Sequence, residues 1–132
     1  MHMAQARSAV LVAEDNEDIR ELVAHQLRRM GVQVLQADNG REAIDLALAE
    51  QPALVLMDMD MPVMSGFEAV AQLRMRGYTK PILALTGYNE GPEAERALSS
   101  GCDGLLGKPI CSDVLRARVN QVLALAVSGS RA

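Results

Sequence analysis

Five short apolar segments alternate with five segments of helical periodicity, and this alternation is the strongest constraint on how the chain folds. The apolar segments predict β-strands over 9–13, 32–37, 54–57, 82–85 and 104–106. Apolar residues three and four positions apart predict helices over 17–30, 41–50, 67–75, 92–100 and 113–126. A chain that alternates strand and helix forms a mostly parallel sheet with helices on both faces. We therefore predict an α/β fold, a flavodoxin-like doubly wound (βα)5 domain with strand order 2-1-3-4-5.

Residues that begin and end helices support these boundaries. Asn16 or Asp15 can cap the first helix, and Gly31 suits the position just after its last turn. Ser112 is expected to cap the last helix. The strand over 32–37 carries two glutamines among its apolar residues, so an edge position in the sheet is expected for it.

The chain of 132 residues has the length of one domain. We expect the folded domain to cover 8–126, with 1–7 as a disordered start or cloning remnant and 127–132 as a tail or the start of a linker. No apolar run reaches the roughly 18 residues of a membrane span, and the start lacks the apolar core of a signal peptide. A cytoplasmic protein without membrane contact is therefore expected.

The charge balance bears on the class of partner. The net charge is −4 and the pI is near 5.1, with Lys and Arg scattered along the chain, which disfavours direct binding to nucleic acid. Cys102 and Cys111 lack the spacing of a metal site. We interpret both as small apolar side chains in a reducing compartment.

Polar residues follow four of the predicted strands, each at the point where the strand ends. They are Asp15, Asp58, Thr86 and Lys108. In a parallel sheet of this order, the carboxyl ends of strands one and three meet where the strand order reverses, and ligands bind there. Glu14 precedes Asp15, and Asp60 lies two residues beyond Asp58. The sequence therefore predicts a site with several carboxylates, one hydroxyl and one ammonium.

This set of groups suits a divalent cation and a phosphoryl group. Carboxylates packed together repel one another unless a cation intervenes, and Mg²⁺ binds one or two carboxylates while bridging to phosphate oxygens. An ammonium and a hydroxyl can bind the remaining phosphate oxygens, and an Asp carboxylate can accept a phosphoryl group covalently. Taken singly, Asp15 reads as a helix cap, Thr86 as a strand residue and Lys108 as solvated surface. Their joint placement at one edge favours a functional site.

Four ordered stretches of the chain resemble the receiver domain of two-component response regulators. These are Leu11-Val12-Ala13-Glu14-Asp15-Asn16, then 56–66 around Asp58, then 81–87 ending in Thr86-Gly87, and 101–109 ending in Lys108-Pro109. The resemblance covers about residues 8 to 126. It implies that Asp58 accepts a phosphoryl group from a phosphohistidine of a histidine kinase or histidine phosphotransfer protein, in a phosphorelay.

The resemblance also implies roles for the neighbouring residues. Glu14 and Asp15 would hold Mg²⁺, or Mn²⁺ in its place, together with Asp58 and the backbone carbonyl of Asp60. Lys108 would contact the acyl phosphate, and its peptide bond to Pro109 would be cis. Thr86 would bond the phosphoryl group and draw its loop inward. The domain would catalyse its own phosphorylation and dephosphorylation without acting as an enzyme on other molecules.

The resemblance also implies that phosphorylation changes one surface of the domain and thereby its binding to a partner. The resemblance implies that the face formed by 92–100, 104–106 and 113–126 binds an output domain or a partner, or a second copy after phosphorylation. Leu105 stands where the family has its switch aromatic, so an aromatic flip coupled to Thr86 is not expected here. Asp60 and Tyr88 occupy variable positions near the phosphoryl group, where we expect them to tune its lifetime.

Two other functions remain open from the sequence. Asp58-Met59-Asp60 after an apolar strand resembles the motif of haloacid-dehalogenase-type phosphatases, although that family places it on the first strand of a longer chain. Alternatively, the domain is a degenerate receiver that serves only as a scaffold, for which Leu105 is the one supporting feature. Phosphate uptake at Asp58 separates the scaffold from the switch, and steady turnover of a phosphomonoester identifies the phosphatase.

Overall fold

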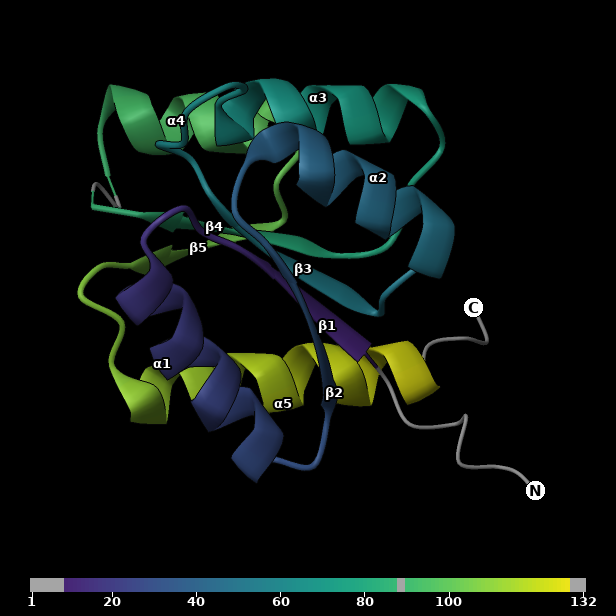
Figure 1. Ribbon diagram of the computed structural model, residues 1–132, viewed down its shortest axis with the longest axis vertical. Coiled ribbons are helices and arrows are strands. Elements are labelled where there is room, and N and C mark those ends of the chain that lie inside the picture. The colour runs from purple at the N-terminus through teal and green to yellow at the C-terminus, as the bar shows by residue number, and fades with distance from the viewer. Residues whose placement is uncertain (1–8, 88–89, 129–132) are drawn as a thin grey trace.

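The computed structural model describes residues 9–87 and 90–128 and confirms the predicted alternation of strands and helices (Figure 1). The elements in chain order are β1 (Ala9–Ala13), α1 (Glu17–Arg29), β2 (Gln33–Ala37), α2 (Gly40–Glu50), β3 (Leu54–Asp58), α3 (Gly66–Met75), β4 (Ile82–Thr86), α4 (Pro92–Ser100), β5 (Gly104–Gly107) and α5 (Ser112–Ser128). The strands form one parallel sheet of order β2-β1-β3-β4-β5, as predicted. None of the described helices is long and apolar enough to cross a lipid bilayer.

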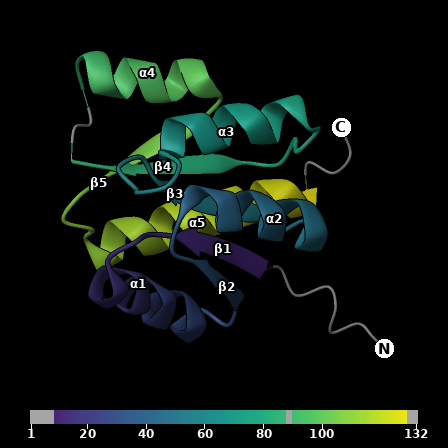
Figure 2. The same cartoon turned by 45° about the horizontal axis from the view of Figure 1, so that its top comes forward.

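Helices cover both faces of the sheet. Helices α1 and α5 lie on one face, and α2, α3 and α4 lie on the other (Figures 1 and 2). Each face has its own cluster of buried apolar side chains. The central strands β3 and β4 are buried along their whole length, because a strand between two helical layers needs apolar side chains on both sides. Polar groups can therefore reach solvent only at the ends of the strands.

The first helix begins as its cap residue predicts. The Asn16 side chain accepts a hydrogen bond from the backbone N–H of Ile19, which satisfies one of the free donors of the first turn. Gly31 follows the helix with φ of +85°, a conformation that glycine adopts without steric cost.

The last helix begins differently from our prediction. Ser112 is its first helical residue rather than its cap, because the backbone carbonyl of Cys111 already accepts from the N–H of Leu115. Both cysteines are free, and Cys111 is exposed at the start of this helix. Cys102 is buried, and burial raises its pKa to about 12, which keeps the thiol protonated and unreactive at neutral pH.

The loop after β3 is anchored against the strand that it leaves. Gly66, the first residue of α3, donates its N–H to the carbonyl of Met59 at 3.0 Å. A Cβ at this position would collide with the carbonyl oxygen of Asp58. The absence of a side chain at Gly66 therefore lets the start of α3 approach the end of β3.

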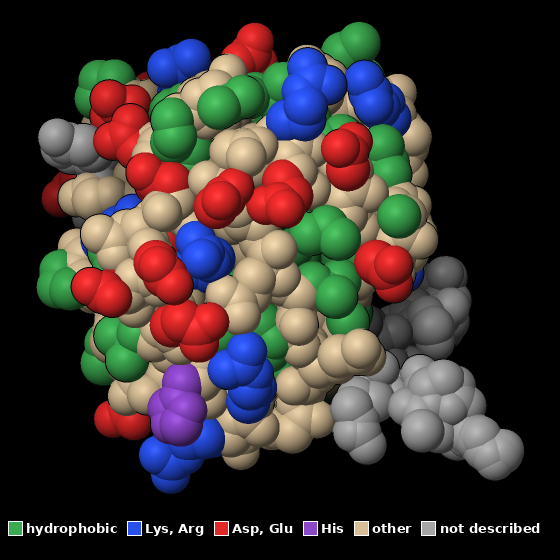
Figure 3. Space-filling model, in the orientation of Figure 1, with side chains coloured by type: hydrophobic (Ala, Val, Ile, Leu, Met, Phe, Trp, Pro, Cys, Tyr) green, Lys and Arg blue, Asp and Glu red, His purple; other side chains and the backbone are tan. Residues whose placement is uncertain are grey.

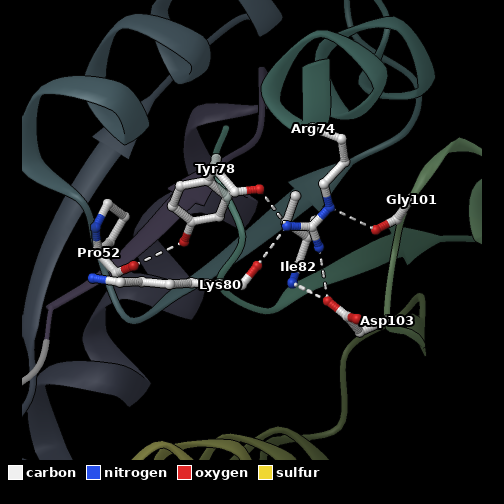
Figure 4. Close-up of polar contacts among 7 residues, drawn as sticks. All are labelled: Pro52, Arg74, Tyr78, Lys80, Ile82, Gly101 and Asp103. Atoms are coloured by element: carbon white, nitrogen blue, oxygen red, sulfur yellow. Dashed lines mark hydrogen bonds and ion pairs between the residues drawn. The ribbon is translucent and has the colours of Figure 1, made fainter. Parts of the chain in front are cut away.

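At the amino ends of β4 and β5, one arginine joins several loops (Figure 4). Arg74 of α3 donates to the carbonyls of Tyr78, Lys80 and Gly101 and forms an ion pair of 2.9 Å with Asp103. Beside this network, the hydroxyl of Tyr78 donates a hydrogen bond to the carbonyl of Pro52 at 2.8 Å. The network ties α3 to the connections that enter β4 and β5.

Charged side chains on the surface are mixed in sign. On the face shown in Figure 3, Lys and Arg side chains are separated by acidic and other side chains and form no continuous basic patch. This distribution agrees with the scattered Lys and Arg of the sequence.

Candidate functional site

Three carboxylates gather at the carboxyl end of the sheet, where β1 and β3 lie side by side. Glu14 and Asp15 directly follow β1, and Asp58 is the last residue of β3. One carboxylate oxygen from each of the three lies within 4.8 Å of the others. The side chains of Glu14 and Asp58 are only 2% exposed, whereas Asp15 is exposed. The sequence prediction that these residues converge is therefore correct in geometry.

A single ammonium group faces the two buried carboxylates. Lys108 Nζ lies 3.0 Å from Asp58 Oδ1 and 3.0 Å from Glu14 Oε1. The backbone of Lys108 is held by a hydrogen bond of 2.8 Å from its N–H to the carbonyl of Thr86. The peptide bond between Lys108 and Pro109 is cis. The loop after β5 thus places one cation between two anions.

Burial and neighbouring charges together set the pKa values of Asp58 and Lys108. Burial raises the pKa of Asp58 to about 7, against the hydrogen bonds from Lys108 and from the Asp60 N–H, which lower it. Burial by itself lowers the pKa of Lys108, but Glu14 and Asp58 outweigh it and leave that pKa above its ordinary value. Lys108 therefore stays charged, and Asp58 retains affinity for a proton chiefly because it is buried, with a smaller contribution from the charge of Glu14.

The acidic cluster fits a divalent cation. Glu14 Oε1 is buried, faces Lys108 and has no hydrogen bond to any described residue. A hard cation prefers carboxylate oxygens, and the three carboxylates together offer several. A bound cation would favour the charged carboxylate of Asp58 and so lower its pKa.

Asp58 opens into a cavity of about 480 Å³. Asp60, Thr86 and Lys108 line it with Asp58, and the Asp60 N–H donates to Asp58 Oδ1 at 3.2 Å. Thr86, the last residue of β4, is buried. The cavity thus brings together residues from the ends of β3 and β4 and from the loop after β5.

Four polar or aromatic side chains that line this cavity were not predicted from the sequence. They are Ser65 and Phe67 at the start of α3 and Glu93 and Arg96 on α4. Helical spacing offered a signal, because residues three apart such as Glu93 and Arg96 share one face of a helix. The sequence did not indicate that this face of α4 turns toward β3.

Leu105 and Tyr88 were expected to modulate the site. Leu105 is partly buried, packs against the cluster under α2, α3 and α4, and is not among the described residues that line the cavity. Tyr88 lies outside the described residues.

Comparisons with known proteins agree with the fold and identify the family. Residues 10–120 match the family model described as the response regulator receiver domain. The response regulator MprA of Mycolicibacterium vanbaalenii is 37% identical over 114 residues, which are 86% of this chain and 49% of that protein. The sensor histidine kinase RcsC of Escherichia coli strain K12 is 34% identical over 107 residues, 81% of this chain and 11% of the kinase.

A solved structure extends the comparison to three dimensions. The structure of the Vibrio cholerae chemotaxis protein CheY4 at pH 4.0 has a TM-score of 0.83 and 34% identity, and covers 88% of this chain and 98% of that one. The chain spans about half the length of the response regulators MprA and PhoP that it matches. Because the family model covers most of the chain and relatives above 30% identity share over 80% of it, the chain belongs to the response regulator receiver domains of two-component signalling.

Proposed function

We propose that this receiver domain accepts a phosphoryl group on Asp58 and thereby switches the binding of a partner. The observation that carries the proposal is a buried aspartate at the end of β3 that contacts Lys108 at 3.0 Å and opens into a cavity. The donor is a phosphohistidine of a histidine kinase or phosphotransfer protein, since relatives of this chain include receiver segments of sensor kinases. A cytoplasmic location belongs to the same proposal.

The geometry favours one carboxylate oxygen of Asp58 as the nucleophile. Oδ1 accepts hydrogen bonds from Lys108 and from the Asp60 N–H, whereas Oδ2 makes none with the described residues. Oδ2 attacks phosphorus, a P–O bond forms, and the P–N bond of the phosphohistidine breaks, which releases the imidazole. Lys108 then neutralises charge on the acyl phosphate. Hydrolysis of the acyl phosphate by water returns Asp58 to its carboxylate.

The acidic cluster would hold Mg²⁺, or Mn²⁺ in its place. Glu14, Asp15 and Asp58 would bind it through carboxylate oxygens, with the backbone carbonyl of Asp60. When bound, the ion supplies positive charge that offsets the carboxylates and the phosphoryl oxygens. Asp58 then carries no proton and is ready to attack.

Thr86 connects the phosphoryl group to the rest of the molecule. Its position at the end of β4, lining the same cavity as Asp58, supports a contact between its hydroxyl and the phosphoryl group. A hydrogen bond to the phosphoryl group would draw the end of β4 inward and alter the face of α4, β5 and α5, which binds the output partner or a second copy. Leu105 lies on this face of the sheet without the ring that an aromatic switch requires, so backbone movement carries the change. Asp60 and Tyr88 would tune the lifetime of the phosphoryl group.

Phosphorylation by a small donor tests the proposal. The protein and its Asp58→Asn variant are incubated with acetyl phosphate and Mg²⁺, and intact mass is measured. We expect a gain of one phosphate in the wild type alone, abolished when Mg²⁺ is removed. No gain in the wild type, with either acetyl phosphate or a phosphorylated phosphotransfer protein, would identify a scaffold receiver.

A further inference from the structure

A second cation lines the cavity into which Asp58 opens. Arg96 projects from α4, and its guanidinium carbon lies 4.0 Å from the centre of the Phe67 ring on α3. Both side chains line the cavity with Asp58, Thr86 and Lys108. An arginine over an aromatic face is attracted by the electrons of the ring, which orders a long side chain without using its N–H donors.

The two cations of the cavity differ in how far their charge is compensated. Lys108 is engaged by Glu14 and Asp58, each at 3.0 Å. Arg96 forms no ion pair with the described residues, and its guanidinium lies over the ring of Phe67. Glu93 lines the same cavity without pairing to Arg96. The exposed guanidinium of Arg96 is therefore available to pair with an incoming anion, whereas the ammonium of Lys108 is already engaged by two carboxylates.

We propose that Arg96, held by Phe67, binds the phosphoryl group of the donor at the mouth of the cavity and sets the preference for donors of high negative charge. This inference rests on the proposed phosphorylation of Asp58. A guanidinium presents parallel N–H groups that match two phosphate oxygens. Arg96 would help to bind the donor, whereas Asp58 and Lys108 would take part in the transfer of the phosphoryl group.

Two small phosphoryl donors of different charge distinguish binding of the donor from transfer of its phosphoryl group. Phosphorylation rates are measured by intact mass against donor concentration, with acetyl phosphate and with phosphoramidate, whose protonated nitrogen lowers its net negative charge. We expect Arg96→Gln to lower kcat/KM for acetyl phosphate about five-fold, through KM, and to lower that for phosphoramidate about two-fold. Arg96→Lys keeps the charge and should retain most of the rate, and Phe67→Leu should give an intermediate loss.

Charge-matched variants serve as controls. Arg29→Gln changes the net charge by the same amount at an exposed residue of α1, outside the cavity. It should leave kcat/KM for both donors within about two-fold of the wild-type value. Glu93→Gln should raise kcat/KM for acetyl phosphate. Equal kcat/KM for wild type and Arg96→Gln, or an equal loss with both donors, would overturn the role of Arg96 while phosphorylation of Asp58 still stands. A wild type that takes up no phosphate from any donor would overturn both proposals.

Discussion

The two ends of the sheet differ in how their charged groups are compensated. At the amino ends of β4 and β5, the guanidinium of Arg74 meets three carbonyls and one carboxylate (Figure 4). At the carboxyl ends, Glu14 and Asp58 share Lys108, and the pKa of Asp58 is raised to about 7. At the amino end, the guanidinium is paired with hydrogen-bond acceptors of opposite or partial negative charge. At the carboxyl end, two carboxylates lie close together and share one ammonium.

This difference separates an end of the sheet that is held in one arrangement from an end whose charges favour ligand binding. A satisfied network holds loops in one arrangement. A cluster of partly compensated carboxylates destabilises the folded protein until a cation or a phosphoryl group arrives. The same sheet therefore carries a fixed end and an end whose charges favour ligand binding.

Removal of the arginine at the fixed end should have the largest effect on stability. In Arg74→Met, the carbonyls of Tyr78, Lys80 and Gly101 lose their donor, and we expect a loss of about 2–4 kcal/mol in the free energy of unfolding. Urea denaturation measures it. Arg29→Met, on an exposed part of α1, is the matched control and should stay within about 0.5 kcal/mol of the wild type. Equal stability of the two variants would contradict the distinction between the two ends.

At the reactive end, removal of a charge should stabilise the metal-free protein. Asp58→Asn removes one of the two carboxylates that share Lys108, so we expect a gain of roughly 1–3 kcal/mol at pH 8 in the presence of a chelator. Addition of Mg²⁺ should stabilise the wild type more than the variant, as measured by thermal unfolding. A metal-free variant less stable than the wild type would show that Asp58 is well compensated by Lys108.

The raised pKa of Asp58 also predicts a dependence of stability on pH. The pKa is about 7 in the folded protein against 3.8 for an ordinary aspartate, so the folded state binds the proton more tightly. Its contribution to stability is fully present below about pH 4 and is lost as the pH rises through 7. Between pH 5 and pH 8, metal-free wild type should lose more stability than Asp58→Asn. Parallel profiles from urea denaturation would exclude Asp58 as the titrating group.

The hydroxyl of Tyr78 offers a smaller test of the fixed end. Tyr78→Phe keeps the buried ring and leaves the carbonyl of Pro52 without its donor, so we expect a loss of about 1 kcal/mol in the free energy of unfolding. Chemical denaturation would measure this change. A loss as large as that of Arg74→Met would indicate that the ring moves when the hydroxyl is removed.

The smallest expected effect lies in the loop after β3. Val63 is exposed and has φ of +68°, a conformation that β-branched residues rarely adopt, and the Met64 N–H donates across it to the carbonyl of Pro62. Val63→Gly should relieve this strain and stabilise the protein by about 0.5–1 kcal/mol, measured by thermal unfolding. Val114→Gly, in α5, is the control, and there the same change should destabilise the protein.

Much of the fold and of the acidic cluster could be predicted because both follow from local pattern and topology. Continuous apolar runs identified the buried strands, and strand order placed Asp58 beside Glu14 and Asp15. The start of α5 was misplaced by one residue, because a serine suits the first helical position as well as the cap. Local sequence does not separate those two positions.

Contacts between distant segments were not predictable in the same way. Arg74 reaches Gly101 and Asp103, which lie 27 and 29 residues away. Its sequence neighbours give no sign of this. Likewise, Arg96 and Phe67 meet only because α3 and α4 pack side by side.

The sequence by itself determined the alternation of strand and helix, the strand order and the meeting of polar residues at one edge. Those features depend on the period of apolar residues and on the handedness of crossovers, which are local or general properties of a chain. Only the tertiary structure decided that Lys108 is shared by Glu14 and Asp58 and that Arg96 turns toward the cavity. Such placements depend on the packing of side chains between elements, because a difference of one rotamer or of a small helix rotation moves a charge by several ångströms.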